Sequence, residues 1–152
     1  MKKKVWANAV WLLFHTLAEK LKPEYCSELP QLFTIFYGIC NNLPCPDCQG
    51  HAVAAMQRAN KQAVCASKEN FITFLWQFHN SVNVRLKTPA FPRAALNARY
   101  VRAKTPQVVQ HFIEVMRGTS NNVNTMLHAF HRQRSVKGFS EYINANQYKF
   151  SA

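Results

Sequence analysis

The sequence predicts an all-α protein: a four-helix bundle, a short fifth helix and a helical C-terminal extension. Two observations support this fold class. The chain of 152 residues contains only 4 glycines, and its apolar residues recur at the three- and four-residue intervals of amphipathic helices. Hydrophobic residues make up 48% of the chain and aromatic residues 12%, which is ample for the core of one domain. Short connections between the first four helices favour an antiparallel arrangement.

The bundle helices are placed by their apolar stripes and by the residues that start or stop a helix. We expect them over residues 4–21, 27–41, 45–60 and 67–88. Pro30 falls in the first turn of the second helix, where its missing N–H is tolerated. Ser67 is a suitable N-cap for the fourth helix, and Pro89 disfavours helical backbone in the residue before it. Each bundle helix therefore has a recognisable beginning or end.

The pattern continues beyond the bundle. Residues 93–103 predict a short fifth helix with Tyr100 facing inward, and a longer helix follows Pro106 and stops at Gly118. The apolar face of that longer helix consists of Val109, Phe112, Ile113 and Met116. Ser120, Asn121 and Asn122 then lead to a segment with Met126, Leu127 and Phe130, where His128 and His131 are interpreted as surface groups. We therefore divide the chain into residues 1–104 and an extension, 105–152, that could form a dimer or partner interface.

The segment from Pro44 to Ala52 carries a Cys-x-x-C pair, Cys45 and Cys48, at the predicted start of the third helix. Pro46 suits the first helical position. Cysteines there lie near free backbone N–H groups and the positive end of the helix dipole, which lower the thiol pKa. A reversible redox disulfide suits this environment. A zinc-ligand pair or two core cysteines are the alternatives, and the motif alone does not decide among them.

A second motif lies one helix further on, where His79, Asn80 and Asn83 cluster in an otherwise apolar helix. On a repeat of 3.6 residues His79 and Asn83 share one stripe with Leu86. Unpaired polar groups on an inward stripe cost about 1–3 kcal/mol each, so these side chains need partners. A polar ligand would satisfy them; a solvated face or internally paired amides is the alternative.

Together these motifs resemble the Erv/ALR family of FAD-linked sulfhydryl oxidases, whose pattern is a flavin-facing Cys-x-x-C followed by a His-Asn-x-x-Asn helix. The family's third signature, an aromatic-and-His stripe on the first helix, is present as Trp11 and His15, one turn apart. The segment from Pro44 to Ala52 is most similar to the branch carried by large cytoplasmic DNA viruses. The resemblance covers about residues 5–91.

This resemblance implies a bundle that holds FAD and oxidises protein dithiols to disulfides, with oxygen as the final acceptor and hydrogen peroxide as product. It implies that Cys45 is the sulfur attacked by substrate and that Cys48 faces the flavin. The cofactor-binding residues it implies are Ala7, Asn8, Trp11, His15, His51, His79, Asn80, Asn83, Leu86, Lys87 and Tyr100. His51 could instead be a helix-packing residue.

The chain departs from the family pattern at several positions. Ala7 stands where the family usually has Gly, and Trp76 stands where cellular members have a cysteine of a structural disulfide. Thr88 replaces a family Lys, so the nearest base is Lys87. A second Cys-x-x-C or Cys-x-C that could shuttle electrons is not found. We therefore expect a thioredoxin-like protein to deliver electrons, and we expect a homodimer.

The cysteine count favours a reducing compartment. Of five cysteines, Cys26, Cys40 and Cys65 lie in apolar settings typical of buried small hydrophobes. The sequence has no apolar run of about 18 residues, and thus no predicted transmembrane helix, and no cue for secretion. We expect a cytoplasmic protein, in a host cytoplasm or a virus assembly site, including association with virus particles.

A formal net charge of +12 indicates a basic surface that could attract nucleic acid, anionic lipid or an acidic partner. Nucleic acid is the less favoured partner, because no recognised nucleic-acid motif accompanies the charge. Two other classes of function remain open. One is a zinc-stabilised binding module using Cys45, Cys48 and His51, with a fourth ligand such as Cys40. The other is a basic nucleic-acid-binding helical protein with a vestigial redox site.

Overall fold

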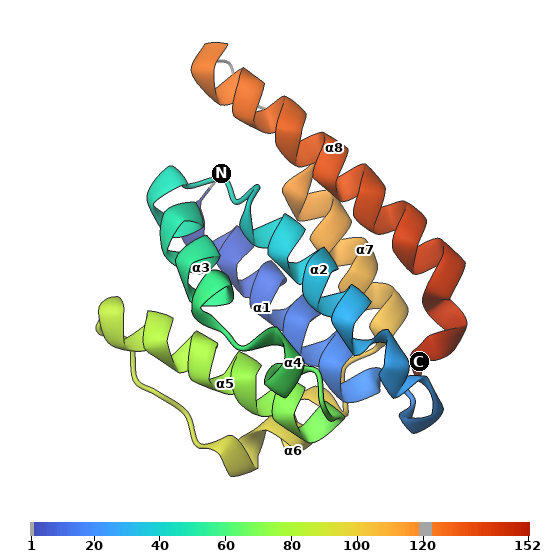
Figure 1. Ribbon diagram of the computed structural model, residues 1–152. Helices are drawn as coiled ribbons and strands as arrows, with labels where there is room; N and C mark the ends of the chain where they lie inside the picture. Colours follow the sequence, from blue (N-terminus) through green and yellow to red (C-terminus); the bar gives the residue numbers. More distant parts are fainter. Residues whose placement is uncertain (1, 119–122) are drawn as a thin grey trace.

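The computed structural model describes residues 2–118 and 123–152, and these residues form the predicted all-α fold (Figure 1). The helices of the bundle are α1 (Lys3–Lys20), α2 (Leu29–Cys40), α3 (Pro46–Arg58) and α5 (Lys68–Arg85). Short helical segments between and after them are η1 (Pro23–Glu28), α4 (Lys61–Val64), η2 (Arg93–Ala95) and α6 (Leu96–Tyr100). The extension consists of α7 (Thr105–Met116), α8 (Val123–Asn146) and η3 (Gln147–Lys149).

The predicted short helix 93–103 is divided into η2 and α6 and ends at Tyr100. Two other helix boundaries that differ from the sequence prediction lie at local turns. Ser27, the predicted start of the second helix, lies in the 3₁₀ segment η1, which contains the non-helical backbone of Tyr25 (φ −111°, ψ 22°). The predicted third helix does not reach Asn60, because Asn60 caps the separate short helix α4 and accepts a hydrogen bond from the Ala63 N–H at 3.1 Å. In both places a local turn interrupts an apolar pattern that reads as continuous helix.

The start of α5 follows the predicted signal, but the helix ends at Arg85, before the predicted stop at Thr88 and Pro89. The Ser67 hydroxyl caps its first turn by accepting a hydrogen bond from the Asn70 N–H at 3.0 Å. At the other end, Lys87 adopts a φ of 57°. This left-handed conformation is common just after a helix, but it favours glycine. Lys87 therefore belongs to the turn that leads away from α5.

Helix α1 lies at the centre of the molecule (Figure 1). It packs against α7 on one side and against α5 and α6 on another, while α2 contacts α3 and α8. Figure 1 shows α8 running along the outside of the molecule, over α7 and α2. The extension thus covers the side of α1 and α2 that faces away from α3 and α5.

The bundle and the extension share one hydrophobic core. Phe14 stacks on Phe36 with ring centroids 4.1 Å apart, and Phe36 also meets Phe71. In the extension Phe112 packs edge-to-face against Phe139 at 5.2 Å. The predicted apolar face of α7 is buried in this core, which confirms that stripe: Val109, Phe112, Ile113 and Met116.

The chain end is joined to the C-terminal end of α1. Leu21 and Phe150 form an isolated antiparallel bridge, and the Ser151 N–H donates to the Lys20 carbonyl at 2.7 Å. Nearby, the Tyr142 hydroxyl and the Lys149 ammonium both donate to the Glu28 carboxylate, at 2.9 Å and 2.8 Å. These contacts hold η1, α8 and η3 together.

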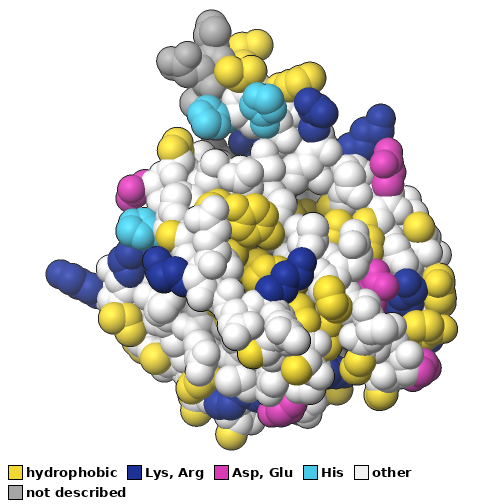
Figure 2. All heavy atoms as spheres, viewed as in Figure 1, with side chains coloured by type: hydrophobic (Ala, Val, Ile, Leu, Met, Phe, Trp, Pro, Cys, Tyr) yellow, Lys and Arg dark blue, Asp and Glu magenta, His cyan; other side chains and the backbone are white. Residues whose placement is uncertain are grey.

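Lysine and arginine side chains are scattered over the face seen in Figure 2, with hydrophobic side chains showing between them. His128 and His131 are exposed, as predicted. The linker residues Ser120 to Asn122 lie outside the described part of the chain. Within the described residues, no helix has the length and apolar character needed to cross a membrane.

Candidate active site

The two cysteines of the Cys-x-x-C motif open helix α3. Cys45 is the N-cap, Pro46 takes the first helical position as predicted, and Cys48 lies in the first turn. The Cys48 N–H donates to the Cys45 sulfur, with 3.3 Å between N and Sγ. Cys45 is half-buried, whereas Cys48 is buried with 7% of its surface exposed. The predicted order of accessibility is therefore confirmed.

The two thiols differ in acidity, and this corrects the expectation that the helix terminus lowers both pKa values. Burial alone would raise the pKa of Cys45, but hydrogen bonds from Cys48 and from the backbone of Asp47 and Cys48, with the charge of Lys3, lower it overall. Burial raises the pKa of Cys48, and the hydrogen bond to Cys45 and the charge on Cys45 raise it further. Because the sulfurs are close, the site favours one negative charge, on Cys45.

The three remaining cysteines are packed among apolar residues, and of the three Cys40 alone is fully buried. Cys40 is buried, and burial raises its pKa to about 12. Cys26 and Cys65 are half-buried, and burial raises the pKa of Cys65. Their packing among apolar residues agrees with the sequence prediction.

Aromatic rings from α1, α5 and α6 form a continuous stack beside the dithiol helix. The Trp11 indole lies flat on the His79 imidazole, with centroids 4.1 Å apart and an interplanar angle of 6°. The His15 Nε2 and His79 Nδ1 atoms are 2.9 Å apart and share a hydrogen bond. Tyr100 also stacks on His15 at 4.7 Å and is buried, inward-facing as predicted. The two motif histidines are thus held by each other and by rings.

Both histidines are neutral at physiological pH. Burial lowers the pKa of His15 to about 3, helped by the neighbouring charges of His79 and Arg99. Burial also lowers the pKa of His79 to about 4, again with Arg99 contributing. A neutral imidazole can donate from one nitrogen and accept at the other. The pair can therefore share one proton and still offer a polar atom to a ligand.

The two asparagines of the motif have different surroundings. The Asn80 amide donates to the Phe91 carbonyl at 3.0 Å, and its oxygen accepts from the Phe91 N–H at 3.2 Å. Asn83 is buried, and its amide donates to the Asn80 oxygen at 3.1 Å. Asn80 therefore fixes the segment after α5, and its amide group is hydrogen-bonded within the protein.

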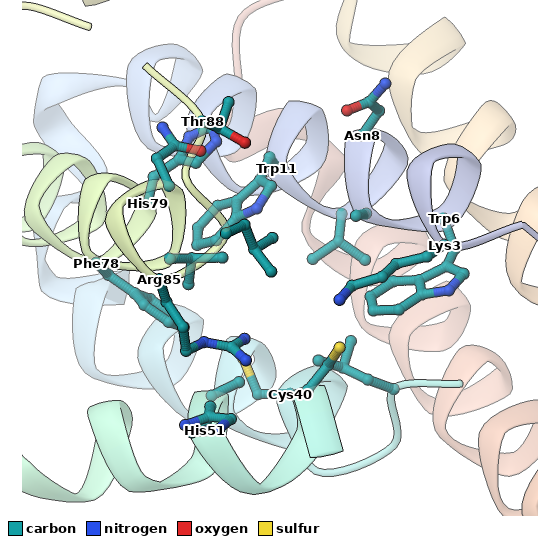
Figure 3. Close-up of a pocket in the computed structure, with 18 of the residues that line it drawn as sticks. Lys3, Trp6, Asn8, Trp11, Cys40, His51, Phe78, His79, Arg85 and Thr88 are labelled. Carbon is teal, nitrogen blue, oxygen red and sulfur yellow. The ribbon is translucent and has the colours of Figure 1, made fainter. Parts of the chain in front are cut away.

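A cavity of about 590 Å³ lies between α1, α3 and α5 (Figure 3). The predicted site residues that line it are Ala7, Asn8, Trp11, Cys48, His51, His79, Asn83 and Leu86. Other walls are apolar and aromatic: Trp6, Val10, Phe14, Leu43, Ala52, Phe78 and Val82. Three motifs far apart in the sequence therefore meet around one space.

Five predicted site residues lie outside the cavity lining. Cys45 lies at the start of α3 beside Cys48. His15 and Tyr100 support the stack behind Trp11 and His79. Asn80 holds Phe91, and Lys87 is exposed in the turn after α5. Lys87 is not part of the cavity lining, although its neighbours Leu86 and Thr88 are.

Sequence reasoning missed three cations that line the cavity: Lys3, Lys4 and Arg85. Figure 3 shows Lys3 and Arg85 extending into the space from opposite sides. Helical spacing could have found them, because Arg85 lies seven residues after Phe78, and Lys3 lies four residues before Ala7. Among the described residues that line the cavity, none is Asp or Glu. The space is therefore suited to an anionic ligand with flat rings.

The structure does not support the zinc alternative. Among residues 2–118 and 123–152, no three side chains of His, Cys, Asp or Glu lie close enough together to hold a metal ion. The zinc-module reading is therefore set aside.

A dithiol on a helix N-terminus, beside a cationic, aromatic-walled cavity in a helical bundle, defines a redox-type site. The sequence profile of the Erv1/Alr family matches residues 8–104. The chain belongs to the Erv1/Alr family. The matched region ends where the extension begins, and no solved structure matches the chain.

Named relatives agree with this family. Protein 096R of Invertebrate iridescent virus 3, named as an FAD-linked sulfhydryl oxidase, is 34% identical over 98 residues, which are 64% of this chain and 66% of the relative. Protein 347L of Invertebrate iridescent virus 6, similarly named, is 28% identical over 102 residues, 63% of this chain and 92% of the relative. FAD-linked sulfhydryl oxidase ERV1 of Oryza sativa subsp. japonica is 30% identical over 101 residues, 66% of this chain but 51% of the relative.

Proposed function

We propose that this protein is an FAD-linked sulfhydryl oxidase that converts dithiols to disulfides with oxygen as electron acceptor. The observation that carries this proposal is the junction of the Cys45–Cys48 pair with the cavity: Cys48 lines it, and Cys45 lies beside it with the lower pKa. Family membership and the names of the relatives support the same activity.

The residues of the cavity fit FAD in chemistry and size. A volume of about 590 Å³ lies within the range of about 300–1,000 Å³ usual for ligand sites. Aromatic walls suit the flat rings, and Lys4 and Arg85 suit a diphosphate. His79 already covers one face of the Trp11 indole, so a ligand ring would meet its edge or other face. Asn83 and His51 would offer polar contacts at the cavity wall.

Flavin supplies the ability to accept two electrons and pass them to oxygen, which amino-acid side chains lack. The chain's own residues handle the sulfur chemistry. In the oxidised enzyme a substrate thiolate attacks Cys45 of the Cys45–Cys48 disulfide, because Cys45 is the more exposed sulfur. The electron pair of the broken bond stays on Cys48, whose position in the cavity lining puts it where a flavin would lie. The second substrate thiol then releases Cys45.

Neutral His15 and His79 have a positioning role in this proposal. Their shared hydrogen bond and stacking fix Trp11 and the polar edge of the cavity. Because they stay uncharged above pH of about 4, they orient the ligand without adding positive charge. Asn80 and Tyr100 do not line the cavity: Asn80 is hydrogen-bonded to Phe91, and Tyr100 stacks on His15. Lys87 contributes only if a ligand extends to the α5 turn.

The proposal extends to a partner and an assembly. A thioredoxin-like protein with acidic patches would deliver electrons to Cys45, since the +12 charge favours such a carrier and the sequence has no second Cys-x-x-C. Such steering weakens as salt rises. A homodimer would have to use surfaces other than the apolar face of α7, which is buried within the chain. Exposed Met126, Leu127 and Phe130 on α8 are available for one.

We further propose a cytoplasmic location, including a virus assembly site or virus particle. Two features support it: Cys26, Cys40 and Cys65 are thiols without a partner, which suits a reducing compartment, and the similar viral proteins bear the same family name.

The first test is spectroscopic. Purified protein should be yellow, with flavin absorbance that is released on denaturation. Protein refolded without flavin should melt at a higher temperature when FAD is added, because a ligand bound only by the folded state raises stability. An unchanged melting temperature with FAD, together with no peroxide from dithiothreitol and oxygen, would overturn the proposed function. Trp11→Ala should lower the FAD effect, while exposed Tyr148→Ala serves as the matched control.

A further inference from the structure

Helix α1 begins with cations where helix electrostatics favour acids. Lys2 is the N-cap and makes no side-chain capping bond, while Lys3 and Lys4 form the first turn, which holds no acidic residue. The N-terminal end of a helix carries a partial positive charge, so cations there are unfavourable. A sequence that breaks a local rule without a structural gain points to a functional use of those residues.

The position of Lys3 indicates what that use is. Lys3 and Cys48 line the same cavity, and Figure 3 shows the amino end of Lys3 turned into it. The charge of Lys3 lowers the pKa of both Cys45 and Cys48. Lys3 on α1 thus lines the same space as a sulfur of the dithiol on α3.

The other charged or titratable groups around the cavity and the first turn of α3 come from each neighbouring helix. They are Lys4 on α1, Cys40 on α2, Asp47 and His51 on α3, and Arg85 on α5. Arg85 enters from the opposite wall (Figure 3), and the Cys40 thiol is neutral. Lys3 is the cation whose charge bears on both sulfurs.

We propose that Lys3 is a charge-stabilising residue of the dithiol, holding the negative charge that forms on Cys48 when a substrate thiol opens the disulfide. This inference rests on the proposed function for the step it serves. In that step the substrate thiolate forms a bond to Cys45 Sγ and the Cys45–Cys48 bond breaks. The electron pair of that bond remains on Cys48 Sγ as a thiolate, in the cavity that the Lys3 ammonium also lines, and no proton moves.

The test measures thiolate formation directly, without turnover. In a Cys45→Ser background, alkylation of reduced Cys48 by iodoacetamide is followed over a pH series by mass spectrometry, with and without Lys3→Met. With Lys3→Met, we expect the pH midpoint of the Cys48 alkylation rate to move to higher pH. The alkylation rate at neutral pH should fall about two- to fivefold, which corresponds to the energy range of exposed charge pairs. The same substitution should slow alkylation of Cys45 in the otherwise unaltered protein, and salt should diminish both differences.

Three controls give the result a single meaning. Lys3→Arg should restore the midpoint, because it keeps the cation. Lys2→Met removes the same charge from the exposed neighbouring residue and should leave the midpoint unchanged. Circular dichroism checks that α1 stays folded. An unmoved midpoint in Lys3→Met, or an equal shift in Lys2→Met, would overturn the proposal.

The outcome is separable from that of the proposed function. Alkylation needs neither flavin nor oxygen, so the Lys3 effect is measured equally in protein that fails to bind FAD. If the protein is an oxidase and the midpoint does not move, only the role of Lys3 is lost. If the midpoint moves in a protein without oxidase activity, Lys3 still controls the dithiol and the oxidase proposal alone is wrong.

Discussion

The bundle and the C-terminal extension each contain a hollow of similar size, of about 590 Å³ and about 690 Å³ respectively. The first is lined by the Cys48 thiol, a Trp–His stack and three cations. The second, between α7 and the end of α8, is lined by apolar and uncharged polar side chains, with Arg117 and the end of the chain. The larger hollow therefore has the poorer chemistry, and residue type identifies the site better than volume does.

The same contrast holds for buried polar groups. Around the bundle cavity, His15 and Asn83 are buried and satisfied chiefly by other residues of the site. In the extension, Arg132 is buried but donates to the backbone carbonyls of Met116 and Gly118, at the end of α7. The buried polar side chains of the bundle thus surround a cavity, whereas the buried Arg132 of the extension binds the carbonyl groups at the end of a helix. We expect substitutions in the two regions to separate activity from stability.

The largest difference should come from the dithiol. Cys48→Ser should abolish oxygen-dependent oxidation of dithiothreitol, because the sulfur that would pass electrons onward is gone. Cys45→Ser should abolish it too, by removing the sulfur that substrate attacks. Cys65→Ser, in the same bundle, is the matched control and should keep turnover within a few fold. Peroxide production measures all three, and full activity in Cys48→Ser would contradict the mechanism.

The extension should contribute mainly to stability. Phe112 is 1% exposed and packs on Phe139. Phe112→Ala should lower the free energy of unfolding by about 3–5 kcal/mol, the usual cost of truncating a core aromatic residue. Exposed Phe130→Ala should change it by less than about 0.5 kcal/mol. Urea denaturation measures both.

That second experiment also tests how the regions are coupled. Because α7 packs along α1, the Phe112→Ala variant should still unfold in one transition, and the loss of circular dichroism should coincide with the release of flavin. Two separate transitions would show that residues 105–152 unfold independently of the bundle. Residue 104 would then separate two unfolding units, in addition to marking the end of the region that matches the family.

Much of this arrangement was accessible from the sequence because local rules and motif order act over short distances. Pro46 and Ser67 mark the starts of α3 and α5, and both were identified correctly. The gathering of Trp11, His79 and Cys48 around one cavity follows from stripes on separate helices. The resemblance to a known family predicts that those stripes face one ligand.

What the sequence did not yield depends on contacts between distant segments. The partner of Asn80 is the backbone of Phe91, which follows an irregular segment that no periodicity describes. The opposite pKa directions of Cys45 and Cys48 arise from a hydrogen bond within the pair and unequal burial, which the helix-terminus argument alone ignores. The cavity cations were missed because a basic residue on a helix most often faces solvent.

A smaller effect concerns pH, and it should belong to the bundle. His15 has a folded pKa of about 3, below the unfolded value of about 6.5. As pH falls below about 6.5 the unfolded chain takes up a proton that the folded protein refuses, so stability is lost toward the folded pKa. The expected contribution is about 1.4 kcal/mol per pH unit. His15→Gln should flatten the pH dependence of urea unfolding, whereas exposed His128→Gln should not.

The smallest expected effect lies where the extension meets the start of the bundle. The Tyr142 hydroxyl on α8 donates to Glu28 Oε1 at 2.9 Å, and Lys149 donates to Oε2 of the same carboxylate. Tyr142→Phe removes one donor and no packing volume. A hydrogen bond to a charged group contributes about 1.5–3 kcal/mol, and the remaining Lys149 contact keeps Glu28 paired, so a loss of about 1–2 kcal/mol is expected. Tyr148→Phe, on an exposed ring nearby, is the control.

This substitution distinguishes a structural extension from a catalytic one. Tyr142 lies outside the bundle cavity, so Tyr142→Phe should lower the urea midpoint while leaving the rate of dithiothreitol oxidation unchanged at a temperature where the variant is folded. A fall in that rate without a fall in stability would mean that the contact between α8 and η1 influences the dithiol site. The extension would then take part in function, in contrast to the separation of roles that its chemistry indicates.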